Sequence, residues 1–427
     1  MRACDSSTYL RSALNPWPVW VVPHSGCKLA SRSRVGAGKA DAPNALMRVI
    51  TLTEDVDLEH QLVGLNGGQA AWVLLYGVQG MPFLRIMNTL RRRQPNLPIF
   101  GATSFRGVFT ERGFIRGAAL LIADREDEIV PAVALEECAV EQARERARTA
   151  CRNIERQLAK RPNMLLLHAT PGFEEAILAG VQDAFGNEVP VYGGSAADDG
   201  LAGRWQVFAN GAVCAEGFLL IGLESQRPPS GGFLGGYLPT QHSGTVTRAT
   251  GRVVYEIDGK PAAAVYNGWT DGAISAEVAK GGSVMDKTNL LPLARKVGKS
   301  SGLPRRLLAH PKEVMAGEGA LSFFAEFSRG DEVTLMTSTR GPLVSRVRRA
   351  VQRARGTAGH AARGALLIYC AGCLGIMLNE ADRIAHEFGQ ELGRVPFVGI
   401  ATFGEQGTFF EKAESLHGNL MCSSILF

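Results

Sequence analysis

Apolar residues recur along the chain in a repeated order. Three continuous apolar runs, at residues 72–76, 164–168 and 365–370, are each followed by a stretch of helical periodicity and then by a second apolar run that ends in glycine. The interval from Tyr76 to Pro98 equals that from His168 to Pro190, at 22 residues, and the third copy is about four residues longer. The pattern therefore predicts three strand–helix–strand units related by an internal repeat.

Each unit is typical of a sheet that is covered on both faces. A strand that is apolar throughout is expected where helices pack on both sides of a sheet, and a strand–helix–strand connection normally joins parallel strands by a right-handed crossover. In the third unit, eight apolar residues between 374 and 392 fall on one helical stripe. We predict an α/β fold with two related mixed α/β domains, each holding a sheet flanked by helices.

Domain boundaries follow from segments of different composition. Strands without intervening helices are predicted at 114–123, 204–209 and 213–223, and a helix at 140–160. A segment at 224–236 is rich in proline and glycine and predicts a linker or long turn. We therefore expect an N-terminal domain over 47–226 and a C-terminal domain over 237–427. Residues 1–46 are rich in Ser, Arg, Gly and Pro, which predicts a disordered tail or a misassigned start before Met47; the sequence leaves both open.

The 46 Lys and Arg residues and 41 Asp and Glu residues of this 427-residue chain are unevenly placed. The first 46 residues hold six Lys or Arg and only two Asp, so most of the net charge of +5 belongs to that segment. The remainder is close to neutral, which argues against an extended phosphate-binding face. Five arginines between 346 and 355 are predicted to form the solvent face of a helix, so no nucleic-acid partner is expected.

Cysteine usage and the lengths of apolar segments bear on the compartment. Eight scattered cysteines in 427 residues are too few for a disulfide scaffold, which favours a reducing cytoplasm. The apolar stretch at 364–379 is too short, and too interrupted by glycine and asparagine, to cross a bilayer. We expect a cytoplasmic protein with no membrane span.

The carboxyl ends of the predicted strands carry glycine loops, and open α/β sheets bind ligands at that edge. Backbone N–H groups of such loops would hold a carboxylate, and Asp198, Asp199 or Glu405 would meet an amine. The two aspartates equally suit the capping of a turn. The predicted ligand-binding residues are Gly101, Thr103, Ser104, Gly193, Gly194, Ser195, Asp198, Asp199, Cys370, Gly372, Gly404 and Glu405. The sequence predicts no metal site and no catalytic residue of a standard pattern.

Two further sets of residues carry alternative functions. Cys370 and Cys373 form a Cys-x-x-Cys pair after a predicted strand and at the start of a helix, where thiols are acidified, as in thiol oxidoreductases. The same cysteines also suit ordinary buried positions. His168 at a strand end and His310 before a proline are the candidate ligands of a haem, and each also suits an ordinary hydrogen-bonded position.

Several segments in combination resemble the FIST domains. The segments at 98–104 (Pro-Ile-Phe-Gly-Ala-Thr-Ser), 191–199 (Val-Tyr-Gly-Gly-Ser-Ala-Ala-Asp-Asp) and 207–211 (Val-Phe-Ala-Asn-Gly) resemble the FIST N-terminal domain. The segments at 255–266, 369–372 (Tyr-Cys-Ala-Gly) and 396–399 (Pro-Phe-Val-Gly), with Gly404 and Glu405, resemble the FIST C-terminal domain. Two positions depart from the family pattern: Cys373 stands where many members have arginine, and Gln406 stands where an aliphatic residue is common.

The resemblance implies a sensory module of signal transduction that binds a small ligand such as an amino acid. It also implies that some relatives are haem proteins that sense nitric oxide and act on a partner histidine kinase. The sequence contains no kinase, cyclase or methyl-accepting segment, so a histidine kinase or cyclase would act in trans. Three hypotheses follow: a small-ligand sensor, a haem-based nitric-oxide sensor, and a thiol oxidoreductase.

Overall fold

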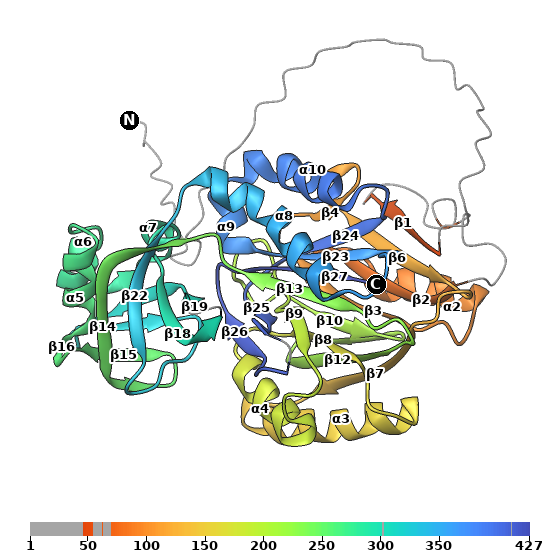
Figure 1. Cartoon of the computed structure of the whole chain (residues 1–427), viewed down its shortest axis with the longest axis horizontal. Coiled ribbons are helices and arrows are strands. Elements are labelled where there is room, and N and C mark those ends of the chain that lie inside the picture. The colour runs from red at the N-terminus through yellow and green to blue at the C-terminus, as the bar shows by residue number, and fades with distance from the viewer. Residues whose placement is uncertain (1–45, 54–61, 63–69, 301–302, 411) are drawn as a thin grey trace, which may run out of the picture.

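The computed structural model describes residues 46–53, 62, 70–300, 303–410 and 412–427. The tail expected at 1–46 therefore lies outside the described residues, except for its last position. The described chain forms a body with three six-stranded sheets and a lobe built on a nine-stranded sheet. The lobe spans residues 238–337 and lies on the left of Figure 1.

The three sheets of the body share one strand order. Sheet 1 consists of β1 (Met47–Leu52), β6 (Ala118–Asp124), β2 (Ala70–Val78), β3 (Ile99–Ser104), β10 (Val207–Ala209) and β11 (Ala212–Cys214). Sheet 2 consists of β7 (Val130–Glu137), β12 (Gly217–Glu224), β8 (Met164–Ala169), β9 (Val191–Gly194), β25 (Glu405–Gly407) and β26 (Leu416–Gly418). Sheet 3 consists of β13 (Ser230–Leu234), β27 (Cys422–Leu426), β23 (Ala365–Cys370), β24 (Phe397–Thr402), β4 (Val108–Thr110) and β5 (Gly113–Ile115). In each, the third and fourth strands are parallel and the other neighbours are antiparallel.

The parallel pair at the centre of each sheet is the strand–helix–strand unit that the repeat predicts, so that prediction is confirmed. Its connecting helices are α2 (Phe83–Arg93) in the first unit, α4 (Glu174–Phe185) in the second, and α9 (Ala371–Gly375), η3 (Leu378–Glu380) and α10 (Ala381–Leu392) in the third. The registers agree as well: a leucine on the first strand faces a glycine on the second in all three, at Leu75 and Gly101, Leu167 and Gly193, and Leu367 and Gly399. The parallel strands of the three units therefore correspond residue by residue.

The outer hairpin of each sheet is supplied by another unit. Hairpin β4–β5 follows β3 but pairs with β24; β10–β11 follows β9 but pairs with β3; and β25–β26 follows β24 but pairs with β9. The hairpins are thus exchanged in a closed cycle of three. Each sheet is completed only by its neighbour, which ties segments that are hundreds of residues apart into one body.

Helices cover the outer faces of the three sheets. Helix α3 (Ala143–Leu158), preceded by η2 (Val140–Gln142), packs with α4 below sheet 2 in Figure 1, and α8 (Arg340–Thr357) packs with α10 above sheet 3. The inner faces share one hydrophobic core that includes Trp72, Tyr76, Leu166 and Ile368. Among the helices that the structure describes, none is long and apolar enough to cross a membrane.

The lobe is inserted between β13 and α8 of the third unit. Its strands are β14 (Leu238–Thr250), β15 (Val253–Ile257), β16 (Lys260–Pro261), β17 (Gly282–Ser283), β18 (Leu293–Ser300), β19 (Leu303–Ala309), β20 (Pro311–Met315), β21 (Ala320–Phe323) and β22 (Glu332–Thr337). Its helices are α5 (Ala262–Trp269), α6 (Ser275–Lys280) and α7 (Met285–Thr288). A separate core around Tyr266 and Phe323 holds these elements together.

The expected fold class is confirmed: the structure is mixed α/β, with several mixed sheets flanked by helices, in two domains. The boundaries at 47–226 and 237–427 stay a prediction. Hydrogen-bonded strands cross that division, because β4 pairs with β24 and β9 pairs with β25.

The linker predicted at 224–236 is wrong for residues 230–234, which form β13. The glycines there allow close packing. A Cβ on Gly231 would lie 2.2 Å from the ring of Tyr192, and one on Gly232 would lie 2.1 Å from the carbonyl oxygen of Ala350. A glycine pair looks the same in a sequence whether it gives flexibility or close approach.

The predicted solvent face of α8 is wrong for Arg346, whose side chain is fully buried. Its guanidinium lies 4.4 Å from the ring centroid of Tyr369, and its Nη1 donates a hydrogen bond of 2.7 Å to the carbonyl oxygen of Leu420. Helical spacing explains the placement, because residue 346 follows Leu343 by three positions and precedes Ala350 by four on the face that packs on sheet 3.

Candidate functional site

The ends of the parallel strands meet at the centre of the body. Backbone hydrogen bonds join corresponding positions of the three units: Phe105 N to Ala401 O at 3.0 Å, Ala197 N to Thr103 O at 3.0 Å, and Phe403 N to Ser195 O at 3.2 Å. These bonds close a triangle. The structure thus brings together most of the loops that carry the predicted ligand-binding residues.

The glycines of these loops make close contacts between backbones. A Cβ on Gly101 would lie 1.7 Å from the carbonyl oxygen of Leu75, and one on Gly193 would lie 1.9 Å from that of Leu167. At Gly194 a Cβ would lie 2.5 Å from the Cγ2 of Thr402. Glycine is therefore required at these positions, because a Cβ would collide with the neighbouring strand.

Predicted polar residues at the triangle are fully buried and hydrogen-bonded within the protein. Ser104 Oγ accepts a hydrogen bond of 2.9 Å from Ala401 N, and Thr103 Oγ1 accepts one of 2.9 Å from Gln206 N. Glu405 accepts from Thr402 Oγ1 at 2.8 Å and from Met421 N at 2.9 Å, and burial raises its pKa to about 8 despite these bonds. These groups stabilise the crossing of the three units.

Asp198 and Asp199 hold the loop that follows β9. Asp198 is buried and accepts backbone hydrogen bonds of 2.8–3.2 Å from the N–H groups of residues 200, 202 and 204. Asp199 accepts one of 2.8 Å from Arg106 N and lies 3.6 Å from the guanidinium of Arg116. Asp198 therefore caps the turn of its own loop, as the capping alternative describes, whereas Asp199 ties that loop to the segments after β3 and before β6.

The two candidate haem ligands lie in separate parts of the structure. His168 is fully buried; its Nδ1 donates to the carbonyl oxygen of Gly194 at 3.0 Å and its Nε2 accepts from Tyr76 Oη at 2.8 Å. Burial lowers its pKa to about 4. The ring offers no free nitrogen to an iron atom. His310, which is 6% exposed, lies in the lobe, and its Nε2 is 3.3 Å from the carbonyl oxygen of Met285.

The Cys-x-x-Cys pair is buried at the start of α9. The exposed fraction is 4% for Cys370 and 0% for Cys373, and a Cβ on Gly372 between them would lie 3.2 Å from Asn289 Oδ1. Burial raises the pKa of Cys370. Burial also acts to raise the pKa of Cys373, but it is outweighed by hydrogen bonds from Cys370 and Tyr237 and by the charge of Arg346, so that pKa falls to about 6. An acidic thiol is therefore present, but an external disulfide cannot reach it in this conformation.

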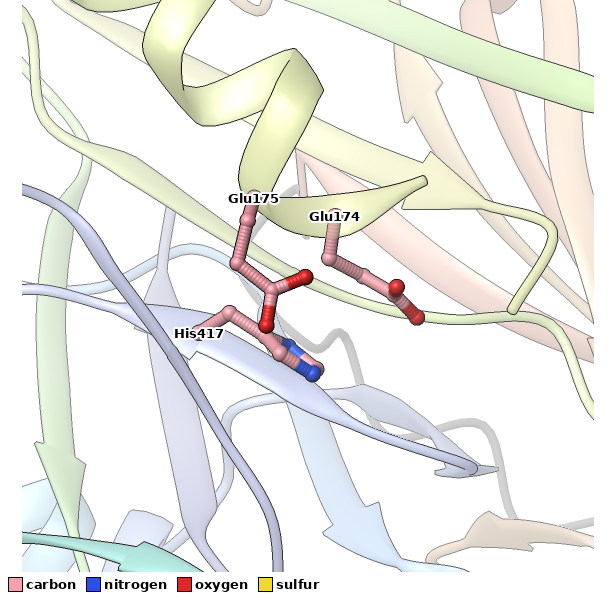
Figure 2. Close-up of side chains that lie close together, drawn as sticks. All are labelled: Glu174, Glu175 and His417. Atoms are coloured by element: carbon pink, nitrogen blue, oxygen red, sulfur yellow. The ribbon is translucent and has the colours of Figure 1, made fainter. Parts of the chain in front are cut away.

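A cluster of charged residues outside the predicted set lies where the lobe meets the body. Glu174 and Glu175 begin α4, His417 stands on β26, and Figure 2 shows Glu175 directed toward the His417 ring. Arg252, from the turn between β14 and β15, donates to both carboxylates, at 2.7 Å to Glu174. We call these four residues the junction cluster. It is the ionic link between lobe and body.

Electrostatics hold Glu174 in its charged form. The side chain is 1% exposed, and burial raises its pKa. The charges of His417, when protonated, and of Arg252 outweigh burial, and hydrogen bonds from Ser195 and Arg252 add to them, so the pKa falls to about 2. Ser195 Oγ donates at 2.6 Å, and thereby joins a predicted residue of the strand ends to the junction cluster.

Gln406 connects the same groups from the other side. Its amide nitrogen lies 3.3 Å from Ser195 Oγ and 3.1 Å from His417 Nδ1. A Cβ on Gly404 would lie 2.4 Å from His417 Cε1, so only glycine allows the ring to sit there. Two residues of the predicted set, Ser195 and Gly404, thus lie directly behind the junction cluster.

The geometry of the cluster also suits a cation. Glu174, Glu175 and His417 each offer a ligand atom within 4.8 Å of the others, which is compatible with a metal ion. Arg252 already supplies positive charge to both carboxylates, however, with ion-pair distances of 2.7 Å to Glu174 and closer to Glu175. The guanidinium therefore meets the electrostatic need that a metal would otherwise fill.

A cavity of about 460 Å³ opens beside the cluster, and we call it the junction cleft. It is lined from the body by Glu175, Leu178, Asp183 and His417, and from the lobe by Arg295, Val297 and Glu326. Arg295 Nε is buried without a hydrogen-bond partner. Partial burial and the charge of Glu175 raise the pKa of Glu326. Both signs of charge thus face one cleft between lobe and body.

The sequence analysis missed the junction cluster because its members come from four distant segments. Glu174 and Arg252 are 78 positions apart, and nothing local to either predicts their contact. The sequence did contain one signal of the cluster. Gln406 stands where FIST domains commonly have an aliphatic residue, and its side chain joins His417 to Ser195.

Comparisons with known proteins agree with this architecture. The sequence profile of the FIST N domain matches residues 71–260, and that of the FIST C domain matches residues 262–408. A segment of 85 residues is 38% identical to "Uncharacterized protein MJ1623" of Methanocaldococcus jannaschii, covering 19% of this chain and 16% of that protein. The chain therefore belongs to the FIST family, whose domains are sensory domains of signal transduction that bind small ligands.

Proposed function

We propose that this protein senses a small zwitterionic metabolite, of the amino-acid class, in the junction cleft. The single observation that carries the proposal is the pairing of opposite charges across one cleft between two parts of the molecule. An amino acid carries a carboxylate and an ammonium about 3 Å apart, so it needs an anion-binding and a cation-binding group side by side.

The cleft offers both groups. Arg295 has a buried Nε without a hydrogen-bond partner, and its Nη1 lies 3.6 Å from Asp331 in a loose ion pair with which a ligand carboxylate would compete. Glu326 lines the same cleft as Glu175; burial first, and then the charge of Glu175, raise its pKa, so an ammonium placed between the two carboxyls would relieve their repulsion. Leu178 and Val297 supply apolar surface for a side chain.

Ligand binding in this cleft would change the link between lobe and body. Glu175 both lines the cleft and accepts a hydrogen bond from Arg252, and its second oxygen accepts one of 3.0 Å from Glu326 N in the lobe. A ligand that competes for Glu175 therefore biases the orientation of the lobe, which is the differential interaction that a switch requires. The buried strand ends, with Ser195 behind Glu174, hold the body side fixed.

The output is proposed to pass through a separate cytoplasmic protein, such as a histidine kinase or a cyclase acting in trans. The family assignment supports a signalling role, and the orientation of the lobe is the property that a partner would recognise. No observation on the charged cleft favours the haem or thiol alternative.

Isothermal titration calorimetry with the twenty amino acids tests the proposal. We expect one chemical subgroup to bind, and Arg295→Met and Glu326→Gln to weaken binding about tenfold or more each, because each removes one charge-assisted hydrogen bond. Glu318→Gln, an exposed residue of the lobe, is the matched control and should bind as the unaltered protein does. Binding that is absent throughout, or that both cleft variants retain in full, would contradict the proposal.

A further inference from the structure

A second cavity at the junction has a different chemical character. It measures about 550 Å³ and lies where β19, α8 and the segment 234–239 come together. Four of its lining residues are arginines, Arg305 and Arg306 from β19 and Arg349 and Arg353 from α8. No aspartate or glutamate is among the residues that line it. We call it the arginine cleft.

The described carboxylates do not neutralise these arginines. Within the part of the chain that the structure describes, none of the four forms an ion pair with Asp or Glu. Arg353 uses Nη2 and Nη1 on the carbonyl oxygens of Phe409, at 2.8 Å, and Phe233, at 3.4 Å. Arg305 Nε is buried without a hydrogen-bond partner.

Holding like charges together is unfavourable, and among the described residues carbonyl oxygens and aromatic rings, not carboxylates, face Arg305 and Arg353. Arg305 and Arg353 are close enough for the charge of Arg305 to contribute, after burial, to lowering the pKa of Arg353. Elsewhere on α8, Arg348 pairs with Glu387 and Glu391, so the helix does neutralise its outward arginines. The difference between the two faces of one helix indicates that the cleft arginines are kept for an anion from outside.

The apolar part of the lining limits the kind of anion. Tyr237, Leu308, Met336 and Phe409 line the cleft beside the arginines. Tyr237 directs its hydroxyl away into the protein, donating to the carbonyl oxygen of Asn289 at 2.7 Å. A ligand with a charged end and a less polar end fits this lining better than a bare ion, and the volume lies within the range of about 300–1,000 Å³ typical of ligand sites.

We propose that the arginine cleft binds a small phosphorylated metabolite that carries at least two negative charges. The planar guanidinium of arginine donates two parallel hydrogen bonds to a pair of phosphate oxygens. Four guanidiniums that no described carboxylate pairs with can neutralise a diphosphate or two separate phosphates. The site goes beyond the proposed amino-acid sensor and is independent of it. The two clefts share Phe409 but no charged residue.

The arginine cleft would give the lobe a second regulated contact. Arg305 and Arg306 belong to the lobe, while Arg349 and Arg353 belong to the body. A phosphorylated ligand that bridges the two pairs therefore draws lobe and body together on this side of the junction, as an amino acid would act at the junction cleft.

Calorimetric titration of the full chain with inorganic pyrophosphate tests the site. Pyrophosphate should bind, and Arg306→Gln and Arg349→Gln should each weaken binding about tenfold or more, because each removes a hydrogen bond between charged groups. Arg306→Lys keeps the charge but loses the paired donors of the guanidinium, so its affinity should lie between that of the unaltered protein and that of Arg306→Gln. Arg348 lies outside the cleft lining and pairs with Glu387 and Glu391 on α10, so Arg348→Gln should leave binding unchanged. Raising the salt concentration should weaken binding to the unaltered protein more than binding to Arg349→Gln.

Other outcomes would overturn the assignment. If pyrophosphate fails to bind at millimolar concentration, or binds the Arg306 and Arg349 variants as tightly as the unaltered protein, the cleft is not a phosphate site. If citrate binds as tightly and with the same loss in the variants, the cleft recognises carboxylates and the phosphate assignment fails. Glu326→Gln, which belongs to the amino-acid site, should leave pyrophosphate binding intact, so failure of one proposal is distinguishable from failure of the other.

Discussion

The hydroxyl of Tyr76 donates a hydrogen bond of 2.8 Å to Nε2 of His168, and the two residues occupy corresponding positions in the first and second units. The third corresponding position holds Ile368. The three side chains share the core where the inner faces of the sheets meet. At this position two copies of the repeat form a complementary polar pair, and the third copy is apolar.

Removal of the Tyr76 hydroxyl tests how much the hydrogen bond between Tyr76 and His168 contributes to the stability of the protein. Tyr76→Phe leaves His168 Nε2 buried without a partner, so we expect the free energy of unfolding to fall by about 1–3 kcal/mol. The control is Tyr192→Phe, because the Tyr192 hydroxyl donates to Gly231 O at 3.1 Å beside a cavity, where water can replace it. Urea denaturation measures both. Equal losses for the two variants would contradict a special role for the buried pair.

The close approach of parallel strands predicts the behaviour of one glycine. In Gly101→Ala the new Cβ would meet the carbonyl oxygen of Leu75 at 1.7 Å, and neither backbone can move without separating β2 from β3. We expect a loss of about 3 kcal/mol or more, or failure to fold. Gly268→Ala is the control, because nothing lies within 4 Å of its Cβ and it sits in α5, where alanine is favoured. A soluble Gly101→Ala protein with unchanged thermal stability would refute the packing argument.

The sequence predicted the local units well because each is defined by its own spacing. The interval between Tyr76 and Pro98 recurs, and the three parallel pairs follow it. The exchange of hairpins was not predictable in this way. Nothing in residues 108–115 says that their partner is β24 rather than β3, because strand pairing depends on contacts across nearly 300 positions.

The same limit applies to the candidate site. The glycine loops correctly predicted where the strand ends meet. Glycine, however, occurs at sites of close packing as readily as at ligand contacts. The close contacts at Gly101 and Gly193 are between backbones. The charged groups of the junction cluster lie at the start of α4, in a turn of the lobe and on β26. Only the fold brings Arg252 to Glu174.

The ionic link at the junction predicts a coupled change in stability and lobe orientation. Arg252→Met leaves Glu174 buried without its cation, so we expect a loss of about 3 kcal/mol, reduced from the value for a fully buried pair by the 25% exposure of the Arg252 side chain. The pKa of Glu174 is lowered, so its contribution is present above its ordinary value and is lost as the pH falls toward about 2. In the variant the pKa of Glu174 should rise because burial is no longer offset by Arg252, so this acid-induced loss of stability should become smaller.

The matched control for the junction is Arg248→Met, whose partner Glu256 lies 3.0 Å away on the surface of the lobe. We expect that variant to lose less than about 1 kcal/mol. Small-angle X-ray scattering provides the second measurement: Arg252→Met should enlarge the radius of gyration, and Arg248→Met should not. If both variants scatter alike, Arg252 does not hold the lobe.

The buried Glu405 predicts a pH dependence of opposite sign. Burial raises its pKa from 4.5 to about 8, so the folded protein binds this proton more tightly than the unfolded chain does. Its favourable contribution is present below the ordinary pKa and is lost as the pH rises to about 8, at about 1.4 kcal/mol per pH unit.

Glu405→Gln keeps the shape of the side chain and can donate to Thr402 while accepting from Met421. The variant should therefore gain stability over the unaltered protein as the pH rises from 5 to 8, whereas exposed Glu318→Gln should follow the unaltered protein. Chemical denaturation across that range decides the matter, because parallel curves for Glu405→Gln and the unaltered protein would mean that Glu405 is charged in the folded state.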